Sequence, residues 1–372
     1  MSEGPRFAPH ALVDFGSAAL QVLGVPEEDA KLTSTSLVEA DRRGVHSHGV
    51  LRLPLYAAAL RAGGITARPR LRWVREVGCT AVLDADGGLG QVAVAAAVRR
   101  ALQLARSSGA AVVAVQRSTH YGAGAFWTDQ LAAEGVIGVL TSTTGPTVAP
   151  YGGAAKVLGT NPLTVGIPSA GDVPLTADMA TSAGAYGKVV AARDEGAPIP
   201  AGWAVDPQGR PTTDPAQAAA GALVPFGGHK GSALAVVLEA LAASLTEATF
   251  AAQTVDIWTD PASRMDTGHL LVAVDTAAFT GREHTERRVA QLQEAVRSSG
   301  RAGAVVHAPG DVEAARAHAR VAAVALARST VEQLEQLARQ LGLPLPDPLP
   351  DPATPGAGTP PTTAAPSAGG PT

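Results

Sequence analysis

Residues 118–143 read STHYGAGAFWTDQLAAEGVIGVLTST: the end of a strand, a glycine-rich turn, a helix and a second strand. Gly122 and Gly124 supply the first half of the G-x-G-x-x-G pattern of Rossmann domains, but Trp127 stands where the third glycine belongs. The second strand ends in hydroxyl side chains and offers no carboxylate for a ribose. This stretch therefore disfavours an ordinary Rossmann domain, and we interpret its glycines as tight turns.

Strands and helices alternate on both sides of this stretch, as shown by hydrophobic periods of two and of three to four residues. The predicted strands are residues 80–86, 110–116, 136–143 and 270–275, and the predicted helices are residues 91–109, 125–135 and 232–248. Both ends of the chain are predicted to be helical, over residues 9–44 (with a break at Gly24 and Pro26) and 54–65 at one end, and over residues 312–327 and 330–342 at the other. Residues 144–230 are rich in Gly and Pro and are predicted to form a long irregular stretch, which points to a functional or flexible segment.

The composition is that of a globular protein, with 46% hydrophobic residues, 17% charged residues and a net charge of −4. This balance gives no reason to expect nucleic acid or an anionic membrane as a partner. No apolar run reaches the roughly 18 residues that span a membrane, and the N-terminus shows no apolar signal segment. We therefore expect a cytoplasmic protein. Cys79 is the only cysteine, so a thiolate zinc cluster is excluded.

Residues 42–52, RRGVHSHGVLR, concentrate histidine and arginine in one short run. On a helix His46 and His48 would point in different directions. On an extended segment they would share a face, but no Asp, Glu or Cys lies nearby to complete a set of ligands, so no metal site is predicted. Arg52 lies four residues after His48 and would share its face of a helix. A guanidinium beside a histidine suits a substrate whose carboxylate adjoins a carbonyl. The alternative is a polar helix end.

Five further segments carry candidate groups. His120 ends a strand, where either a catalytic or a structural histidine can stand, and Asp178 could cap a helix or accept hydrogen bonds from a ligand. Lys188 has apolar neighbours that could partly bury it. FGGHKG, residues 226–231, places backbone N–H groups and a lysine at a helix start, which suits a phosphate. Asp311 follows a Pro-Gly turn and is interpreted as an N-cap.

Read in order, the segments of this chain resemble the malate/L-lactate dehydrogenase family, which is unrelated to the Rossmann-type dehydrogenases and also contains ureidoglycolate dehydrogenase, 2,3-diketogulonate reductase and piperideine-2-carboxylate reductase. The resemblance covers about residues 8–342. The segments that carry it are EADRRGVHSHGVLRLPLY, DADGGLGQ, STHYGAGAFWTDQ, VAPYGGAAKVLGTNPL, DMATSAGAYGKV, IPAGWAVDPQGRPTTDP, LVPFGGHKGSALAVVLEAL and GHLLVAVDTAAF.

The resemblance implies an α/β (α+β) fold with a non-Rossmann nicotinamide-binding domain on a mixed, largely antiparallel sheet, plus a helical domain formed by both chain ends. It also implies a homodimer with the active site near the subunit interface. We accordingly expect four regions: an N-terminal helical part, an NAD(P)-binding and catalytic domain, C-terminal helices that pack on the N-terminal part, and a Pro/Gly/Ala-rich disordered tail. These regions span residues 1–75, 76–300, 301–344 and 345–372.

By matching position, the resemblance assigns catalysis to Ser47 and to His48 as proton donor, with His120 either the second proton-transfer candidate or a cofactor contact. Arg52 and Thr160 match substrate-binding positions. The cofactor-contacting positions are His120, Thr144, Asp178, Met179, Ala180, His229, Lys230, Pro309, Gly310 and Asp311. Lys188 matches a catalytic position that is lysine in the hydroxyacid members and acidic in the imine reductases. Asp311 stands where the family has glutamate, and Thr119 where it has asparagine.

The expected function is therefore hydride transfer between NAD or NADP and C2 of a 2-oxo or 2-hydroxy carboxylate. NADPH remains possible because the strand ending at Thr143 carries no carboxylate that would repel a 2′-phosphate. Two alternatives stay open: reduction of a cyclic imine carboxylate such as piperideine-2-carboxylate, and a non-catalytic ligand-binding homologue. The retention of His48 and Arg52 speaks against the second.

Overall fold

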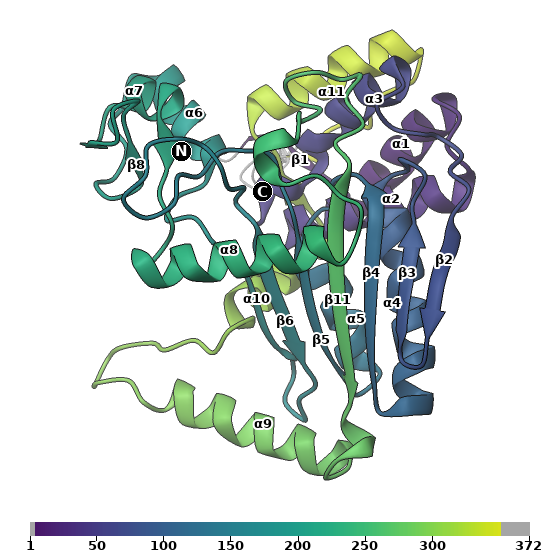
Figure 1. The fold of residues 1–372 in the computed structure, drawn as a ribbon. Helices are drawn as coiled ribbons and strands as arrows, with labels where there is room; N and C mark the ends of the chain where they lie inside the picture. The colour runs from purple at the N-terminus through teal and green to yellow at the C-terminus, as the bar shows by residue number, and fades with distance from the viewer. Residues whose placement is uncertain (1–3, 351–372) are drawn as a thin grey trace, which may run out of the picture.

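The computed structural model describes residues 4–350, and a seven-stranded sheet forms its centre (Figure 1). Only β3 and β4 pair in parallel, and every other neighbouring pair is antiparallel. The predicted mixed, largely antiparallel sheet is thus confirmed. In spatial order its strands are β2 (Arg72–Val77), β3 (Thr80–Asp84), β4 (Ala110–Ser118), β11 (Thr267–Asp275), β5 (Val136–Ser142), β6 (Pro162–Ile167) and β7 (Leu175–Ala180).

The position of β11 explains why the glycine-rich turn does not lead into a Rossmann domain. β4 and β5 are neighbours in sequence, but β11 lies between them and pairs antiparallel with both. Most of its residues are buried, because the sheet is covered on both faces. The glycine-rich turn after β4 therefore lies beside an antiparallel strand. It does not lie at the switch point of a parallel sheet, which is where a Rossmann domain binds its cofactor.

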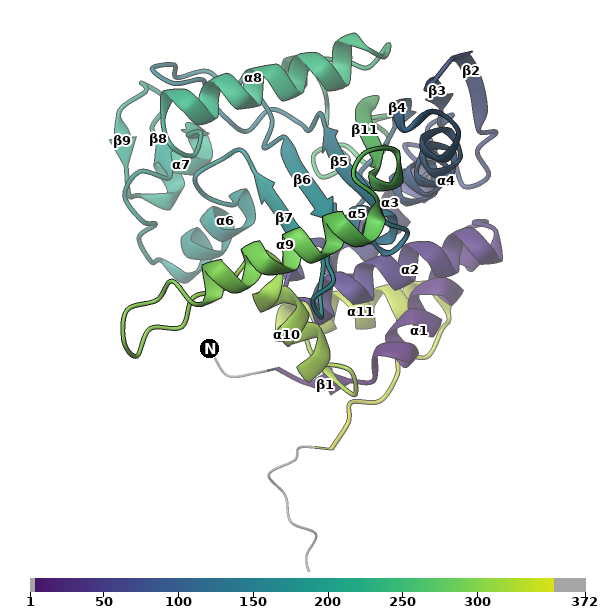
Figure 2. The ribbon, with the colours of Figure 1, turned by 90° about the horizontal axis from the view of Figure 1, so that it is seen from below.

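Helices cover the two faces of the sheet. α4 (Gly90–Ser108) and α5 (Ala125–Ala133) pack on one face, and α8 (His229–Ser244) crosses the other (Figures 1 and 2). Residues on one side of α4 recur every four positions as alanine, which lets the helix lie close to the strands. These fully buried alanines are Ala93, Ala97, Ala101 and Ala105.

The two ends of the chain pack together in a second core. α1 (Pro9–Val22), α2 (Glu27–Arg42) and α3 (Leu53–Ala62) meet α11 (Arg328–Leu341), and β1 (Arg6–Phe7) pairs with β12 (Val324–Ala325). Buried apolar side chains from both ends share this core, among them Phe7, Leu12, Leu20, Leu334 and Leu337. The domain boundaries given above stay predictions. The part of the predicted tail over residues 351–372 lies outside the described residues.

The prediction of a long irregular stretch over residues 144–230 is wrong. That stretch contains β6, β7 and two helices, α6 (Tyr186–Glu195) and α7 (Pro215–Ala220). It also contains a small antiparallel sheet of β10 (Ala222–Leu223), β8 (Ala204–Val205) and β9 (Pro211–Thr212). Strands of two residues have no hydrophobic period to detect, and the short helices stand among the Gly and Pro residues that suggested a loop.

The predicted helix over residues 312–327 is also too long. α10 (Asp311–Ala319) ends early, because Val324 and Ala325 leave the helical path to pair with β1. α9 (Arg282–Arg297), a largely exposed helix, had no counterpart among the predicted elements. Short 3-10 turns complete the described chain: η1 (His46–His48), η2 (Val50–Arg52), η3 (Ala251–Gln253) and η4 (Thr276–Ala278). Within residues 4–350, no helix combines the length and apolarity that crossing a bilayer requires.

Candidate active site

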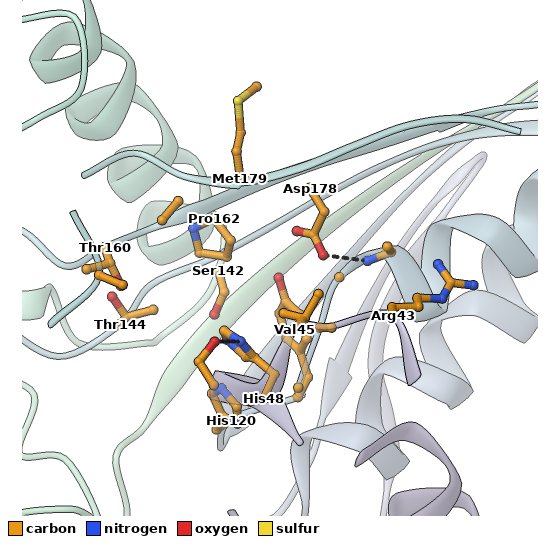
Figure 3. A pocket seen from close by; sticks show the side chains of 18 of the residues that line it. Arg43, Val45, His48, His120, Ser142, Thr144, Thr160, Pro162, Asp178 and Met179 are labelled. Atoms are coloured by element: carbon orange, nitrogen blue, oxygen red, sulfur yellow. Dashed lines mark hydrogen bonds between the residues drawn. The ribbon is translucent and has the colours of Figure 1, made fainter. Parts of the chain in front are cut away.

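One large cavity, of about 2170 Å³, lies between the helical part and the ends of the central strands. Its walls come from segments far apart in sequence: η1 and η2, the turn after β4, the end of β5, strand β7, the loop 254–259 and helix α10. Figure 3 shows His48 and His120 beside each other in this cavity, with Thr144 and Thr160 to one side and Asp178 to the other.

A buried carboxylate shapes the turn that carries the histidine and arginine. Asp41, near the end of α2, accepts hydrogen bonds from the backbone N–H of Val50 at 2.7 Å and from His46 Nδ1 at 2.8 Å. Gly49 packs so closely against this carboxylate that a β-carbon there would overlap it. The segment is therefore neither a continuous helix nor extended, but two 3-10 turns, and these turns bring Ser47, His48 and Arg52 to the cavity.

His48 and His120 stack with their ring centroids 5.3 Å apart. Burial, and secondly the positive charge of Arg52, lower the pKa of His48 to about 4. Burial also holds the pKa of His120 well below its ordinary value, helped by His48 and Arg52. Both imidazoles are therefore neutral at pH 7. Ser47 Oγ lies 2.9 Å from His48 Nδ1, within hydrogen-bonding distance.

Arg52 keeps part of its guanidinium available. Its Nε donates to the backbone oxygen of Ser47 at 2.7 Å, and the group lies 4.5 Å from the ring centroid of Trp258. Arg52 forms no ion pair with any residue between 4 and 350. Burial raises the pKa of nearby Asp256 to about 6, against the opposing effects of Arg52 and the Gly145 N–H. The terminal guanidinium nitrogens can thus bind a ligand carboxylate in the bidentate way.

Asp178 lines the cavity from β7, and both of its oxygens are engaged. It accepts hydrogen bonds from the Ala125 N–H at 2.9 Å and from Thr164 Oγ1 at 2.7 Å. Ala125 is the first residue of α5, so Asp178 accepts from an N–H group at a helix N-terminus. This helix is distant from Asp178 in the sequence. Burial nevertheless raises the pKa of Asp178.

Most of the remaining expected residues also line the cavity, and these are Thr144, Thr160, Met179, Ala180, Pro309, Gly310 and Asp311. The interpretation of Asp311 as an N-cap is wrong, because Gly310 is the cap and the Asp311 side chain makes no capping bond. Its carboxylate is bound instead by Arg297, at 2.7 and 2.9 Å, and by the Ala308 N–H. Arg297 accordingly lowers the pKa of Asp311.

Three expected residues do not line this cavity: Lys188, His229 and Lys230. The expectation that apolar neighbours bury Lys188 is wrong, because α6 leaves this side chain exposed, with Nζ 5.9 Å from the Trp203 ring centroid. His229 and Lys230 begin α8 and are exposed as well. Within a single chain, the GGHKG turn is therefore not part of the cavity wall.

Three residues around the histidines were missed from the sequence. Tyr56 lies on the helical pattern of residues 53–62 and has the appearance of a core aromatic, yet its hydroxyl lies 2.6 Å from His120 Nδ1. Asp256 and Trp258 stand in QTVDIWTDP, which matches no motif considered above. One signal was present for Tyr56, since it follows Arg52 by four residues on a helix.

Comparison with known proteins gives one consistent result. The sequence profile of the malate/L-lactate dehydrogenase family matches residues 7–335. The L-sulfolactate dehydrogenase of Methanocaldococcus jannaschii is 36% identical over 329 residues, which cover 88% of this chain and 95% of that protein. The solved structure of sulfolactate dehydrogenase from that organism has a TM-score of 0.86 to this chain, with 35% identity, covering 91% of this chain and 98% of the other.

Two further relatives differ in the reactions that their names describe. The (2R)-3-sulfolactate dehydrogenase (NADP(+)) of Chromohalobacter salexigens is 40% identical over 287 residues, covering 76% of this chain and 86% of that protein. The structure of delta1-piperideine-2-carboxylate reductase from Pseudomonas syringae has a TM-score of 0.81 and 32% identity, covering 89% of this chain and 99% of the other.

Proposed function

The chain belongs to the malate/L-lactate dehydrogenase family, and we propose that it transfers hydride between NAD or NADP and C2 of a 2-oxo or 2-hydroxy carboxylate. The observation that carries this proposal is one cavity in which Arg52, which forms no ion pair within residues 4–350, stands beside two neutral histidines, His48 and His120. These residues can bind a carboxylate and transfer a proton to the oxygen on the neighbouring carbon.

In the direction of reduction, Arg52 binds the substrate carboxylate and thereby fixes the C2 carbonyl near the histidines. A nicotinamide held in the same cavity would supply the hydride for C2. His48 gives a proton to the carbonyl oxygen, and Ser47 exchanges a hydrogen bond with the other nitrogen of the same ring. A bound carboxylate also offsets the charge of Arg52, which raises the pKa of His48 and favours its protonated form.

The cavity fits a dinucleotide together with a substrate. Its volume is about 2170 Å³, against roughly 300–1,000 Å³ for a pocket that holds one drug-sized molecule. We propose that the cofactor lies along β7 and the start of α10 and contacts His120, Thr144, Asp178, Met179, Ala180, Pro309, Gly310 and Asp311, while Thr160 contacts substrate. Relatives bear names with NADP(+) and with NAD(+), so both cofactors belong to the proposal.

We also propose a homodimer. α8 presents a stripe of exposed apolar side chains four residues apart, Val237, Leu241 and Leu245. His229 and Lys230 begin the same helix, so a partner on this face lies close to both. Their expected contact with cofactor, and that of Lys188 with substrate, requires a second subunit to complete the site. A cytoplasmic location stays part of the proposal, on the composition of the sequence.

Reduction of a cyclic imine carboxylate is the second candidate, and the structural similarity to a piperideine-2-carboxylate reductase favours it. Arg52 would bind its carboxylate in the same way, and the proton would go to nitrogen. Lysine at position 188 favours the hydroxyacid reaction.

The test follows absorbance at 340 nm with NADH and NADPH in parallel, offering pyruvate, oxaloacetate, 3-sulfopyruvate, 2,3-diketogulonate and piperideine-2-carboxylate. We expect cofactor oxidation with at least one 2-oxo acid, and its loss in His48→Ala. Activity with the cyclic imine alone would replace the first candidate by the second. Nicotinamide binding without turnover of any of these compounds would favour a non-catalytic homologue.

A further inference from the structure

A buried chain of hydrogen bonds stands behind His120 and involves neither Ser47 nor Arg52. Gln91, on α4, donates from Nε2 to the Tyr56 hydroxyl at 3.0 Å. The same hydroxyl, on α3, lies 2.6 Å from His120 Nδ1. Gln91 and Tyr56 are both completely buried, so water does not substitute for a missing partner. This chain links the helical part of the molecule to the turn after β4.

The direction of the chain follows from the number of protons that each group holds. A phenol hydroxyl has one proton to donate, and it accepts with its lone pairs. The Tyr56 oxygen already accepts from Gln91, and His120 Nδ1 is the one acceptor within reach of its own proton among residues 4–350. Burial raises the pKa of Tyr56 to about 12, so this proton stays in place at neutral pH. Tyr56 therefore donates and His120 Nδ1 accepts.

The two histidines consequently differ in what they can do. Because Nδ1 of His120 accepts with its lone pair, the single proton of the neutral ring is on Nε2. Nε2 is the nitrogen that remains available to a ligand. Protonation of His120 would add a proton to Nδ1, which would then point at the proton of the Tyr56 hydroxyl. The buried Tyr56 hydroxyl would lose its hydrogen-bond acceptor. His48 meets the Ser47 hydroxyl instead, which is exposed and can turn to accept from a charged ring or donate to a neutral one.

We infer that Tyr56 is a positioning residue that fixes His120 as its Nε2–H form, so that His120 donates a hydrogen bond to the substrate oxygen while His48 transfers the proton. This inference rests on the proposed function for the substrate. It assigns separate roles to two stacked histidines, of which the sequence named His48 as the first and His120 as the second candidate for proton transfer. The state of the His120 ring, however, is a property of the free protein and is measurable without substrate.

The first experiment is ¹⁵N NMR of the free protein with labelled histidine, with His120 identified by its absence in His120→Gln. We expect the wild type to show a proton on Nε2 and none on Nδ1. Tyr56→Phe should abolish the preference and give a mixture of the two neutral forms. A proton on Nδ1 in the wild type would overturn the inference, because that result means that the Gln91 amide is turned over and the chain runs the other way.

Tyr121→Phe is the matched control for the loss of a buried hydroxyl. Tyr121 is the next residue after His120 and is also buried, but its hydroxyl has no hydrogen-bond partner among the described residues. This variant should keep the wild-type His120 signal. If Tyr121→Phe changed the signal as much as Tyr56→Phe does, the effect would come from packing and the inference would fail.

The second experiment compares His48→Gln with His120→Gln. Glutamine carries an N–H near the position of histidine Nε2 but has no proton to transfer at neutral pH. His120→Gln should therefore lose about tenfold in kcat or less, as for one hydrogen bond, whereas His48→Gln should lose about 10²- to 10⁴-fold. The reverse order would overturn the assignment. A wild type inactive on every substrate would contradict the proposed function while leaving the NMR result standing.

Discussion

Arg52 is the residue on which the proposed binding of the substrate carboxylate depends most directly. Replacing it by lysine keeps the charge but removes the planar fork that matches a carboxylate. We expect Arg52→Lys to raise KM about 10- to 100-fold, with a smaller change in kcat, because the lost contact holds substrate before and during the reaction. Steady-state kinetics measure both constants. Arg339→Lys, on an exposed part of α11, serves as control, and an unchanged KM in Arg52→Lys would contradict the assignment.

Asp256 gives the site a pH dependence of its own. Its pKa is about 6, so it is neutral well below this pH and negatively charged above it. The charge opposes a carboxylate that binds at Arg52. Asp256→Asn should therefore lower KM about three- to tenfold at pH 8 and leave it nearly unchanged at pH 5. KM measured from pH 5 to 8 tests this; a higher KM in the variant at pH 8 would mean that Asp256 orients Arg52 instead.

At this scale the sequence revealed residues that stand together in a motif and missed those that come together only on folding. Ser47, His48 and Arg52 occupy one short run, and the buried Asp41 that bends this run into 3-10 turns lies close before it. Tyr56 and Asp256 carry no such mark. Tyr56 acts through a hydrogen bond with His120, 64 positions away, and Asp256 through its charge near Arg52, 204 positions away, and no local pattern records either interaction.

Among the elements, β11 joins the core of the sheet to the rear of the cavity. His269 lies fully buried at the start of this strand, with Nδ1 2.8 Å from Ser142 Oγ and Nε2 2.8 Å from Ser118 Oγ. One histidine thus links β11 to both neighbouring strands. Burial lowers its pKa to about 3.

This histidine predicts acid sensitivity of folding. In the unfolded chain this histidine has a pKa of about 6.5 and binds a proton below that pH, whereas in the folded chain it stays neutral. The free energy of unfolding therefore falls as the pH drops from 6.5 towards 3. The contribution of His269 is about 2 kcal/mol between pH 7 and pH 5. Urea unfolding at the two pH values should show a smaller loss for His269→Gln than for wild type. Equal losses would show that His269 does not carry this dependence.

The elements themselves were predicted more successfully than their pairing. Long, strongly periodic segments such as α4, α8 and α11 appear where the sequence places them. The place of β11 between β4 and β5 depends on contacts across more than 100 residues, which periodicity does not encode. The two-residue strands β8, β9 and β10 exist because of tertiary contacts, so a Gly- and Pro-rich stretch was interpreted as a loop.

For the whole molecule, the exposed stripe on α8 predicts the state of assembly. Leu241 is 40% exposed and lies between Val237 and Leu245 on one side of the helix. Leu241→Glu should convert the proposed dimer to a monomer, because an unpaired charge at the centre of an apolar interface is costly. Light scattering after gel filtration measures the mass. Leu292→Glu, on exposed α9, should leave the dimer intact, and a wild-type monomer would refute the proposed interface.

The family and the sheet type were both evident from the sequence, because many ordered segments carry the resemblance at once. The site itself was harder to predict, because the cavity draws its walls from segments that are distant in sequence. Three expected site residues do not line the cavity of a single chain, and their roles stay predictions. A single chain does not bring Lys188, His229 and Lys230 to the histidines.

The proposed reaction passes hydride between the nicotinamide and C2 of a carboxylate, and deuterium transfer reports on this step itself. NADH and NADPH carrying deuterium at C4, on each face in separate samples, would be mixed with the protein and the 2-oxo acid that it turns over. NMR of the product should show deuterium at C2 of a 2-hydroxy acid, from one cofactor face only. Deuterium in a cyclic amino acid alone, or none in any product while cofactor is consumed, would contradict hydride transfer to a 2-oxo acid.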